Sequence, residues 1–351
     1  MTLNPSRDAA IDPFGERRRY PYAMTKPVLG ARFRFESTSL ALLDVAEAAY
    51  GGLPPCQWPD ATPEFRIELR LQRRAPCYAS EPPPMQMQSG AGVLCGVVDA
   101  FNYVVITATE RRALIVASED MLAHAYHLRY ELIEFAVFTL ATRGLGLVPL
   151  HGACVGLGGR GLLLLGASGA GKSTLALHCL LQGFDVLAED AVFVRPDPLL
   201  AVGVGNYLHV QPHALSLVGD DAARRWINQS PVIRRRSGVE KFEVDLRRRA
   251  PSGLADAPMQ IAGVVFVSGR LSSSIEALLT PIPARDVLPR LATDQPYATG
   301  QPGFERFARH IERLGVYELH RGRHPDESVE ALRGLLCDAS RASCKQSVAS
   351  G

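Results

Sequence analysis

The sequence predicts an α/β protein in two parts, with an α+β domain in the N-terminal half and an α/β core in the C-terminal half. The chain has 351 residues, which is long enough for two domains. In the first half, apolar residues alternate with polar ones, as in half-buried strands. In the second half, a glycine-rich turn stands between an apolar strand and a helix, which is typical of an α/β core.

The composition is that of a globular protein with a substantial core. Apolar residues make up 47% of the chain, and the net charge of +2 gives no reason to expect a nucleic-acid partner. Arginines form three short runs, at 17–19, 234–236 and 247–249. We interpret the first and third as solvated faces. The second is a candidate for contact with an acidic substrate or a phosphate.

Cysteine usage and hydropathy predict a cytoplasmic protein without a membrane span. The seven cysteines are odd in number and form no CxxC pair, so we expect reduced thiols and neither a disulfide framework nor a zinc knuckle. Residues 1–20 lack the apolar core of a secretory signal. The longest apolar stretch, residues 132–150, is interrupted by Glu134, Arg143 and Pro149.

The local patterns divide the chain into four segments. They are a loosely ordered N-terminus at 1–30, an α+β domain at 31–147, an α/β core at 148–337 and a flexible tail at 338–351. In the second segment we expect strands at 65–71, 93–98, 103–108 and 114–117, and a helix over 118–143. Gly144 ends that helix, and the domain boundary follows at 144–149.

The third segment is expected to alternate strands and helices. We expect strands at 153–157, 161–165, 186–188, 191–194, 264–267 and 317–320, and helices at 172–182, 285–291 and 325–336. Gly156, Gly158 and Gly161 match the dinucleotide pattern GxGxxG, which must open a helix. Here a strand follows instead, so we interpret these glycines as a turn between two strands.

A phosphate-binding loop carries the chemistry of this segment. The motif GxxxxGK[ST] is matched by Gly166, Ala167, Ser168, Gly169, Ala170, Gly171, Lys172 and Ser173, and Thr174 follows. Backbone N–H groups of such a loop and the N-terminus of the following helix bind phosphate oxygens. We expect ATP with Mg²⁺, with Lys172 on the β- and γ-phosphates and Ser173 on the metal.

Two adjacent acids follow the loop. Glu189 and Asp190 come after a short apolar strand, with Asp190 eighteen residues beyond Lys172. The carboxyl end of that strand is expected at the edge of the sheet where ligands bind in open α/β folds. One acid is expected to hold Mg²⁺ and the other to accept a proton from an attacking hydroxyl.

Three histidines are weaker candidates. His151 opens the first strand of the core, fifteen residues before Gly166, and we keep it as a candidate at the phosphates. His178 and His209 have no partner in the sequence, and we assign them as structural or solvent-facing residues.

At this point the residues resemble the catalytic domain of the HPr serine kinase/phosphorylase family. The resemblance rests on His151-Gly152, the loop 166–173 and the pair Glu189-Asp190, which together span roughly forty residues. It implies a P-loop kinase core that is also similar to phosphoenolpyruvate carboxykinase. It further implies that Glu189 is the catalytic base, that Asp190 is a metal partner and that His151 lies near the phosphates.

Departures from the family pattern point to another target. The family commonly has two aspartates where this chain has Glu189-Asp190, and the C-terminal signature of the phosphorylase reaction is not found. The loop is similar to those of divergent relatives in peptide-modification clusters, including ones that phosphorylate lasso-peptide precursors. The resemblance therefore implies a serine-type hydroxyl on a protein or peptide as the acceptor.

Two other functions stay open at this stage. One is a nucleotide-dependent binding or switch module, and the other is a small-molecule kinase. A transporter ATPase is disfavoured because no LSGGQ-like segment is found. On the substrate side, the candidates are Arg234, Arg235, Arg236 and Lys241. No nucleic acid or membrane is expected as a partner, and a homo-oligomer is left open.

Overall fold

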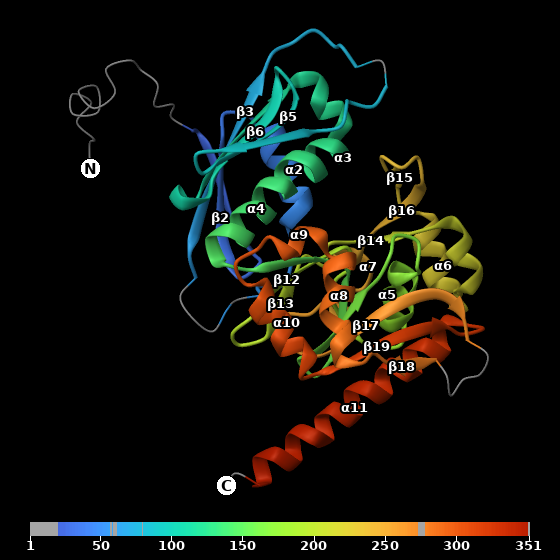
Figure 1. The fold of residues 1–351 in the computed structure, drawn as a ribbon. Helices are drawn as coiled ribbons and strands as arrows, with labels where there is room; N and C mark the ends of the chain where they lie inside the picture. The colour runs from blue at the N-terminus through green and yellow to red at the C-terminus, as the bar shows by residue number, and fades with distance from the viewer. Residues whose placement is uncertain (1–19, 57, 59–61, 79, 273–277, 350–351) are drawn as a thin grey trace, which may run out of the picture. The chain divides into compact units, whose positions relative to one another are not determined.

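Figure 1 shows the computed structural model, which describes residues 20–349 except 57, 59–61, 79 and 273–277, with side chains up to residue 338. The chain forms two compact units. The first contains the residues up to Thr25, Arg34–Ala48 and Arg66–Ala136, and the second contains Lys26–Phe33, Ala49–Phe65 and the chain from Val137 onward. The units thus interleave along the chain, whereas local patterns predicted one boundary near 144–149. The domain bounds given above stay a prediction.

A seven-stranded sheet is built from the first strands of the chain. Its order is β1-β2-β3-β7-β6-β5-β4. The strands are β1 (Tyr22–Val28), β2 (Ala31–Ser37), β3 (Glu64–Gln72), β4 (Gln86–Gly90), β5 (Val93–Asp99), β6 (Asn102–Thr107) and β7 (Arg112–Ser118). The expected alternation in β3 is confirmed, because Phe65, Ile67 and Leu69 are fully buried. The expected hairpin is confirmed as the antiparallel pair β5–β6.

The strand β1 corrects the sequence-based expectation for residues 22–28, which were placed in a loosely ordered N-terminus. These residues include Pro27, and proline suggested irregular backbone. Because β1 is the edge strand of the sheet, a residue without a backbone N–H is tolerated there.

The helical segment after β7 is less regular than the predicted helix over 118–143. It begins as 3₁₀ helix (Glu119–His124), continues through α3 (Ala125–His127) and a π-helical turn (Leu128–Ile133), and ends in α4 (Glu134–Leu145). An earlier helix, α2, spans Leu40–Tyr50. The left-handed glycine that ends α4 is Gly146, with φ 64°, and not Gly144 as predicted. Gly144 instead lies under the Phe65 ring, which a Cβ atom would approach to 2.5 Å.

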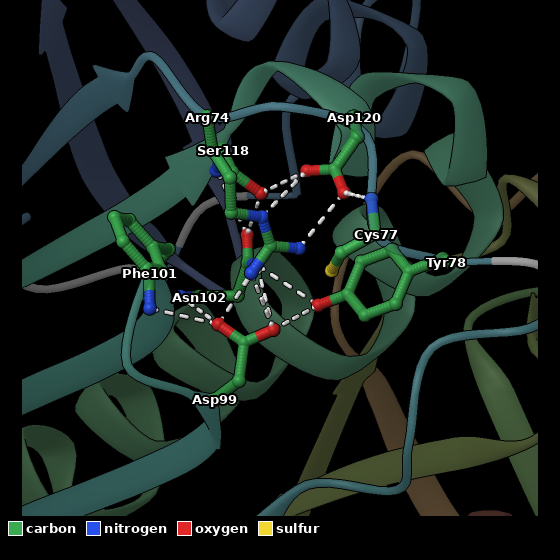
Figure 2. Close-up of polar contacts among 8 residues, drawn as sticks. All are labelled: Arg74, Cys77, Tyr78, Asp99, Phe101, Asn102, Ser118 and Asp120. Atoms are coloured by element: carbon green, nitrogen blue, oxygen red, sulfur yellow. Dashed lines mark hydrogen bonds and ion pairs between the residues drawn. The ribbon is translucent and has the colours of Figure 1, made fainter.

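Within the first unit, the half-buried Arg74 joins a loop to the hairpin (Figure 2). Arg74 donates to Asp120 Oδ2 at 2.8 Å and to Asp99 Oδ2 at 3.0 Å. Its guanidinium also lies over the rings of Tyr78 and Phe101, at 4.8 and 5.2 Å from their centroids. Since Asp99 ends β5 and Asp120 follows β7, this Arg74 cluster connects three segments around one cation.

The second unit is built on a nine-stranded sheet. Its main path is β11-β9-β10-β17-β13-β12-β8, with β19 beside β17 and β18 beside β19. The strands are β8 (Val148–His151), β9 (Ala153–Leu157), β10 (Arg160–Leu165), β11 (Asp185–Ala188), β12 (Ala191–Arg195), β13 (Leu200–Gly203), β17 (Met259–Leu271), β18 (Leu279–Pro281) and β19 (Gly315–Arg321). The expected turn between two strands is confirmed, because β9 and β10 form an antiparallel hairpin.

A small sheet and the helices that follow the phosphate-loop motif complete this unit. The small sheet has the order β14 (Tyr207–Val210), β16 (Glu240–Asp245), β15 (Val232–Arg234). The helices are α5 (Lys172–Leu181), α6 (Asp221–Asn228), α7 (Leu246–Arg249), α8 (Ala284–Asp294), α9 (Pro296–Thr299), α10 (Phe304–Glu312) and α11 (Pro325–Ala349); 3₁₀ turns lie at Pro212–Leu217 and Pro251–Gly253.

These elements confirm the predicted α/β core and place its helix α5 in the interior. Leu175, Ala176 and Cys179 of α5 are buried in the main apolar cluster. The helix α11, red in Figure 1, continues to Ala349 and so includes most of the segment predicted as a tail from residue 338. In the described part of the chain, no helix combines the length and the apolar character that a membrane crossing requires.

Candidate active site

The predicted glycine-rich turn lies between the buried strand β10 and the first residue of α5. Gly166, Gly169 and Gly171 have φ angles of 130°, 82° and 105°, in the region that favours glycine. At Gly166 a Cβ atom would also lie 2.5 Å from the carbonyl oxygen of Val267 on β17. The three glycines of the motif thus adopt backbone angles that favour glycine, and close packing also requires the first of them.

Lys172 is folded back onto this loop. Its Nζ donates to the carbonyl oxygens of Gly166 at 2.5 Å and of Ala167 at 3.2 Å. Burial lowers the pKa of Lys172, while the carboxylates of Asp294, Asp190 and Glu189 act in the opposite direction. The ammonium group is thus surrounded by acceptors, as expected for a cation that binds phosphate oxygens.

Glu189 contacts the loop directly. Ser173 Oγ donates a hydrogen bond to Glu189 Oε1, and His209 Nδ1 lies 2.9 Å from Glu189 Oε2. Only 4% of Glu189 is exposed. Both carboxylate oxygens are therefore engaged, one by the residue expected to bind the metal.

His209 belongs to this site, which corrects its assignment as a structural or solvent-facing residue. It pairs in register with Glu243 across β14 and β16, and its Nε2 lies 3.5 Å from Glu243 Oε1. Burial lowers the pKa of His209, but the hydrogen bonds with Glu189 and Glu243 prevail and raise it above its ordinary value. A histidine between the apolar residues Leu208 and Val210 was the available signal.

Asp190 faces a different set of groups. His151 Nδ1 lies 3.5 Å from Asp190 Oδ1, and the Arg235 guanidinium lies 3.2 Å from Asp190 Oδ2. Gly152 N donates to the backbone oxygen of Asp190 at 3.1 Å, which joins the residue after β8 to the residue before β12, the strand that pairs with β8. The Asp190 side chain is 31% exposed, so it is open to an incoming molecule.

The other predicted substrate-side residues lie at varying distances from these acids. Arg235 contacts Asp190, whereas Arg234 and Arg236 are exposed side chains. Lys241 is half-buried on β16 and close enough to lower the pKa of Lys172 by charge repulsion.

Two residues that the sequence analysis did not identify, Asp294 and Gln295, form hydrogen bonds with the backbone of Gly166 and His151. Asp294 Oδ2 accepts from Gly166 N at 3.1 Å and from Gln295 Nε2 at 2.7 Å. Gln295 accepts from the backbone N–H of His151 at 2.7 Å and donates to its carbonyl at 3.0 Å. Both lie at the end of α8, far from the motif in sequence, where no local pattern marks them.

The oxygen atoms and N–H groups around the loop are of the kinds that bind Mg²⁺ and phosphate. The Ser173 hydroxyl and the Glu189 carboxylate are hard oxygen ligands in contact with each other, the kind that Mg²⁺ prefers. The N-terminus of α5 and the turned glycines present N–H groups suited to phosphate oxygens. The site thus suits a magnesium-bound polyphosphate.

Comparisons with known proteins give relatives for part of the chain. No family model matches the sequence. The HPr kinase/phosphorylase of Cupriavidus pinatubonensis is 32% identical over 145 residues, covering 37% of this chain and 44% of the relative. That of Caldicellulosiruptor bescii is 41% identical over 162 residues, covering 46% of this chain and 44% of the relative. The chain therefore spans less than half the length of these curated relatives.

Among solved structures, the HPr(Ser) kinase/phosphatase of Coxiella burnetii is similar at 12% identity. The match covers 56% of this chain and 98% of that one, with a TM-score of 0.29.

Proposed function

We propose that this HPr-kinase-like chain is an ATP- and Mg²⁺-dependent phosphotransferase whose acceptor is a serine-type hydroxyl of a protein or peptide. The observation that carries the proposal is the contact between Ser173 of the loop and Glu189, next to a second, accessible acid, Asp190. The curated relatives named HPr kinase/phosphorylase support the same class of reaction. We place the enzyme in the cytoplasm, where ATP is supplied.

The loop and its lysine would bind the nucleotide. Backbone N–H groups between Ala167 and Thr174 would hold phosphate oxygens, and Lys172 would exchange its loop carbonyl acceptors for the β- and γ-phosphates. Ser173 and Glu189 would hold Mg²⁺, which, when bound, neutralises charge on the transferring group.

For the two acids, the contacts favour the reverse of the roles that the family resemblance implies. Glu189 is buried, and its oxygens are engaged by Ser173 and His209, so it is a poor acceptor for the proton of an incoming hydroxyl. Asp190 is partly exposed. We therefore assign Glu189 to the metal and Asp190 to general base catalysis, in which its carboxylate takes the hydroxyl proton as the acceptor oxygen attacks phosphorus.

Groups around Asp190 would position it. Arg235 contacts one of its oxygens and His151 approaches the other, so the carboxylate is held in one orientation. The peptide or protein acceptor is supported by the exposed cations Arg234 and Arg236, which flank Arg235 and suit an acidic segment around the acceptor serine.

The decisive experiment incubates the purified protein with ATP and Mg²⁺ and each of three acceptors: a serine-containing acidic peptide, an HPr-type protein and free hydroxyl metabolites. Phosphate is followed by mass, with Lys172→Ala as the inactive control. We expect transfer to a polypeptide serine and none by the variant. Transfer only to a metabolite would establish the small-molecule kinase, and ATP binding without any transfer would establish a binding or switch module.

A further inference from the structure

A cluster of two histidines and an aspartate lies outside the loop site. His178 is in the last turns of α5, and His324 and Asp326 flank the start of α11. His178 Nδ1 lies 2.9 Å from Asp326 Oδ1, and His324 Nδ1 lies 3.2 Å from Asp326 Oδ2. One nitrogen or oxygen atom from each residue lies within 4.8 Å of the others.

The hydrogen bonds of His324 determine which of its nitrogens carries the proton. Its Nε2 lies 2.9 Å from the carbonyl oxygen of Leu217, which only accepts, so Nε2 must donate. Its Nδ1 lies 3.3 Å from the backbone N–H of Asp326, which only donates. In this neutral tautomer, the Nδ1 lone pair lies beside a carboxylate oxygen of Asp326. Two acceptors at this distance repel each other unless a proton or a metal ion lies between them.

This arrangement of His324 is the one found at metal centres. A histidine that binds a metal usually donates its other ring N–H to a backbone carbonyl or a carboxylate, which fixes the tautomer and the ring orientation. Leu217 supplies that carbonyl here. Gln182 Nε2 donates to Asp326 Oδ1 at 2.6 Å and so supports the carboxylate in a comparable way.

His178 is the buried member of the cluster. Its side chain is 4% exposed, and its Nδ1 is directed at Asp326. Its Nε2 has no hydrogen-bond partner among the described residues. The rings of His178 and His324 meet edge to face with centroids 5.3 Å apart, so both present nitrogen atoms to one carboxylate.

We propose that His178, His324 and Asp326 form a binding site for a divalent transition-metal ion, with Zn²⁺ as the best fit. Two imidazoles and one carboxylate are ligands that Zn²⁺ accepts, whereas Mg²⁺ prefers oxygen alone. With metal–ligand bonds of about 2.0–2.1 Å, tetrahedral geometry sets neighbouring ligand atoms about 3.3 Å apart. The contacts of 2.9 and 3.2 Å are made to the two different oxygens of Asp326, and the ligand atoms of the three residues lie within 4.8 Å of one another. The side chains would therefore move together on binding the ion.

The site would connect α5 to the start of α11 at some distance from the phosphate loop. His178 follows Lys172 by six residues on α5, which corresponds to about 9 Å along the helix axis. An ion there would tie the helix that begins at the loop to the terminal helix, and would do so without contacting a nucleotide.

The test uses the full chain, stripped of metal with a chelator and kept free of nucleotide. Zn²⁺ is titrated against a fluorescent chelator in excess Mg²⁺, which occupies oxygen sites. The variants are His324→Ala and Asp326→Asn, and the control is His213→Ala, an exposed histidine outside the cluster. We expect one Zn²⁺ per wild-type or control chain and binding weaker by at least about tenfold in either variant.

A second readout does not depend on the chelator. Zn²⁺ should raise the midpoint of thermal unfolding for wild type and control and leave it unchanged for the two variants. Circular dichroism establishes that each variant is folded, and His324→Gln replaces any variant that is not. Equal Zn²⁺ affinity in variants and control, or no binding by wild type, would overturn the site and leave a metal-free hydrogen-bonded cluster. Neither result bears on phosphoryl transfer.

Discussion

Ser173 and Glu189 are joined by a hydrogen bond from the Ser173 hydroxyl to one carboxylate oxygen of Glu189. The first residue is on α5 and the second follows β11, so the contact brings the end of the loop motif to the end of a neighbouring strand. We base the different roles proposed for the two adjacent acids on this contact, since Asp190 faces His151 and Arg235 instead.

Substitution of each acid should separate metal binding from proton transfer. Asp190→Asn should lower kcat for phosphoryl transfer by on the order of 10²–10⁴-fold with ATP affinity nearly unchanged, because a base acts on the acceptor hydroxyl. Glu189→Gln should instead raise the Mg²⁺ concentration needed for half-maximal ATP binding. Steady-state kinetics and a nucleotide-binding titration measure the two effects.

The opposite result has a definite meaning. If Glu189→Gln lost turnover with normal Mg²⁺ dependence, and Asp190→Asn lost Mg²⁺ affinity, the roles implied by the family resemblance would hold. Normal behaviour of both variants would remove the two acids from the mechanism.

Replacement of His209 should weaken the metal site through Glu189. His209→Asn removes the ring whose Nδ1 lies 2.9 Å from Glu189 and whose Nε2 approaches Glu243. Loss of such a supporting contact typically costs about 10–100-fold in metal affinity. We expect Mg²⁺-dependent binding of a fluorescent ATP analogue to weaken by this factor. The matched control is His213→Ala, and equal affinities in both variants would show that His209 only fills space.

The exposed arginines should act on the acceptor and not on ATP. In the double variant Arg234→Gln/Arg236→Gln, Arg235 keeps its contact with Asp190. We expect a several-fold higher KM for an acidic peptide and an unchanged KM for ATP. The effect should be largest at low salt, because exposed charges act over about 10 Å at 0.1 M.

A control for general charge loss is available on the same unit. Arg248 and Arg249 are also exposed, and their double glutamine variant makes the same change in net charge. If both double variants changed the acceptor KM equally, local recognition by Arg234 and Arg236 would be excluded, and only the overall charge would matter.

The Arg74 cluster should stabilise the fold in a pH-dependent way. Burial raises the pKa of Asp120, but hydrogen bonds from Arg74, Ser118 and the Cys77 N–H outweigh it and hold the pKa well below its ordinary value. Because the folded state lowers this pKa, the stabilisation is complete above the unfolded value of about 4 and is lost as the pH falls below it.

Urea unfolding of Asp120→Asn measures this contribution. We expect a loss of about 1–3 kcal/mol at pH 7, since hydrogen-bond donors of the cluster lose a charged acceptor. The difference from wild type should shrink as the pH falls below about 4. Asp44→Asn, at an exposed position of α2, should change neither the free energy of unfolding at pH 7 nor its dependence on pH. A deficit for Asp120→Asn that stayed constant with pH would rule out its charge as the source.

The sequence predicted the elements whose signals are local. Alternation in 65–71 located β3, and the glycines and Lys172 located the loop and α5, because each depends on neighbouring residues. The sequence did not predict the groups that meet through the fold. Asp294 reaches Gly166 across 128 residues, and His209 meets Glu189 only because β14 lies beside α5. Such pairings depend on strand order, which no single segment encodes.

Gln295 bonds both backbone groups of His151, accepting from its N–H and donating to its carbonyl. The main chain at this position is therefore anchored by another residue and does not rely on the imidazole. A different side chain at 151 would start from the same Cα position and point toward the same space beside Asp190. In evolution or in protein design, the side chain at residue 151, and with it the functional group beside Asp190, can thus be replaced while the backbone of residue 151 keeps its position.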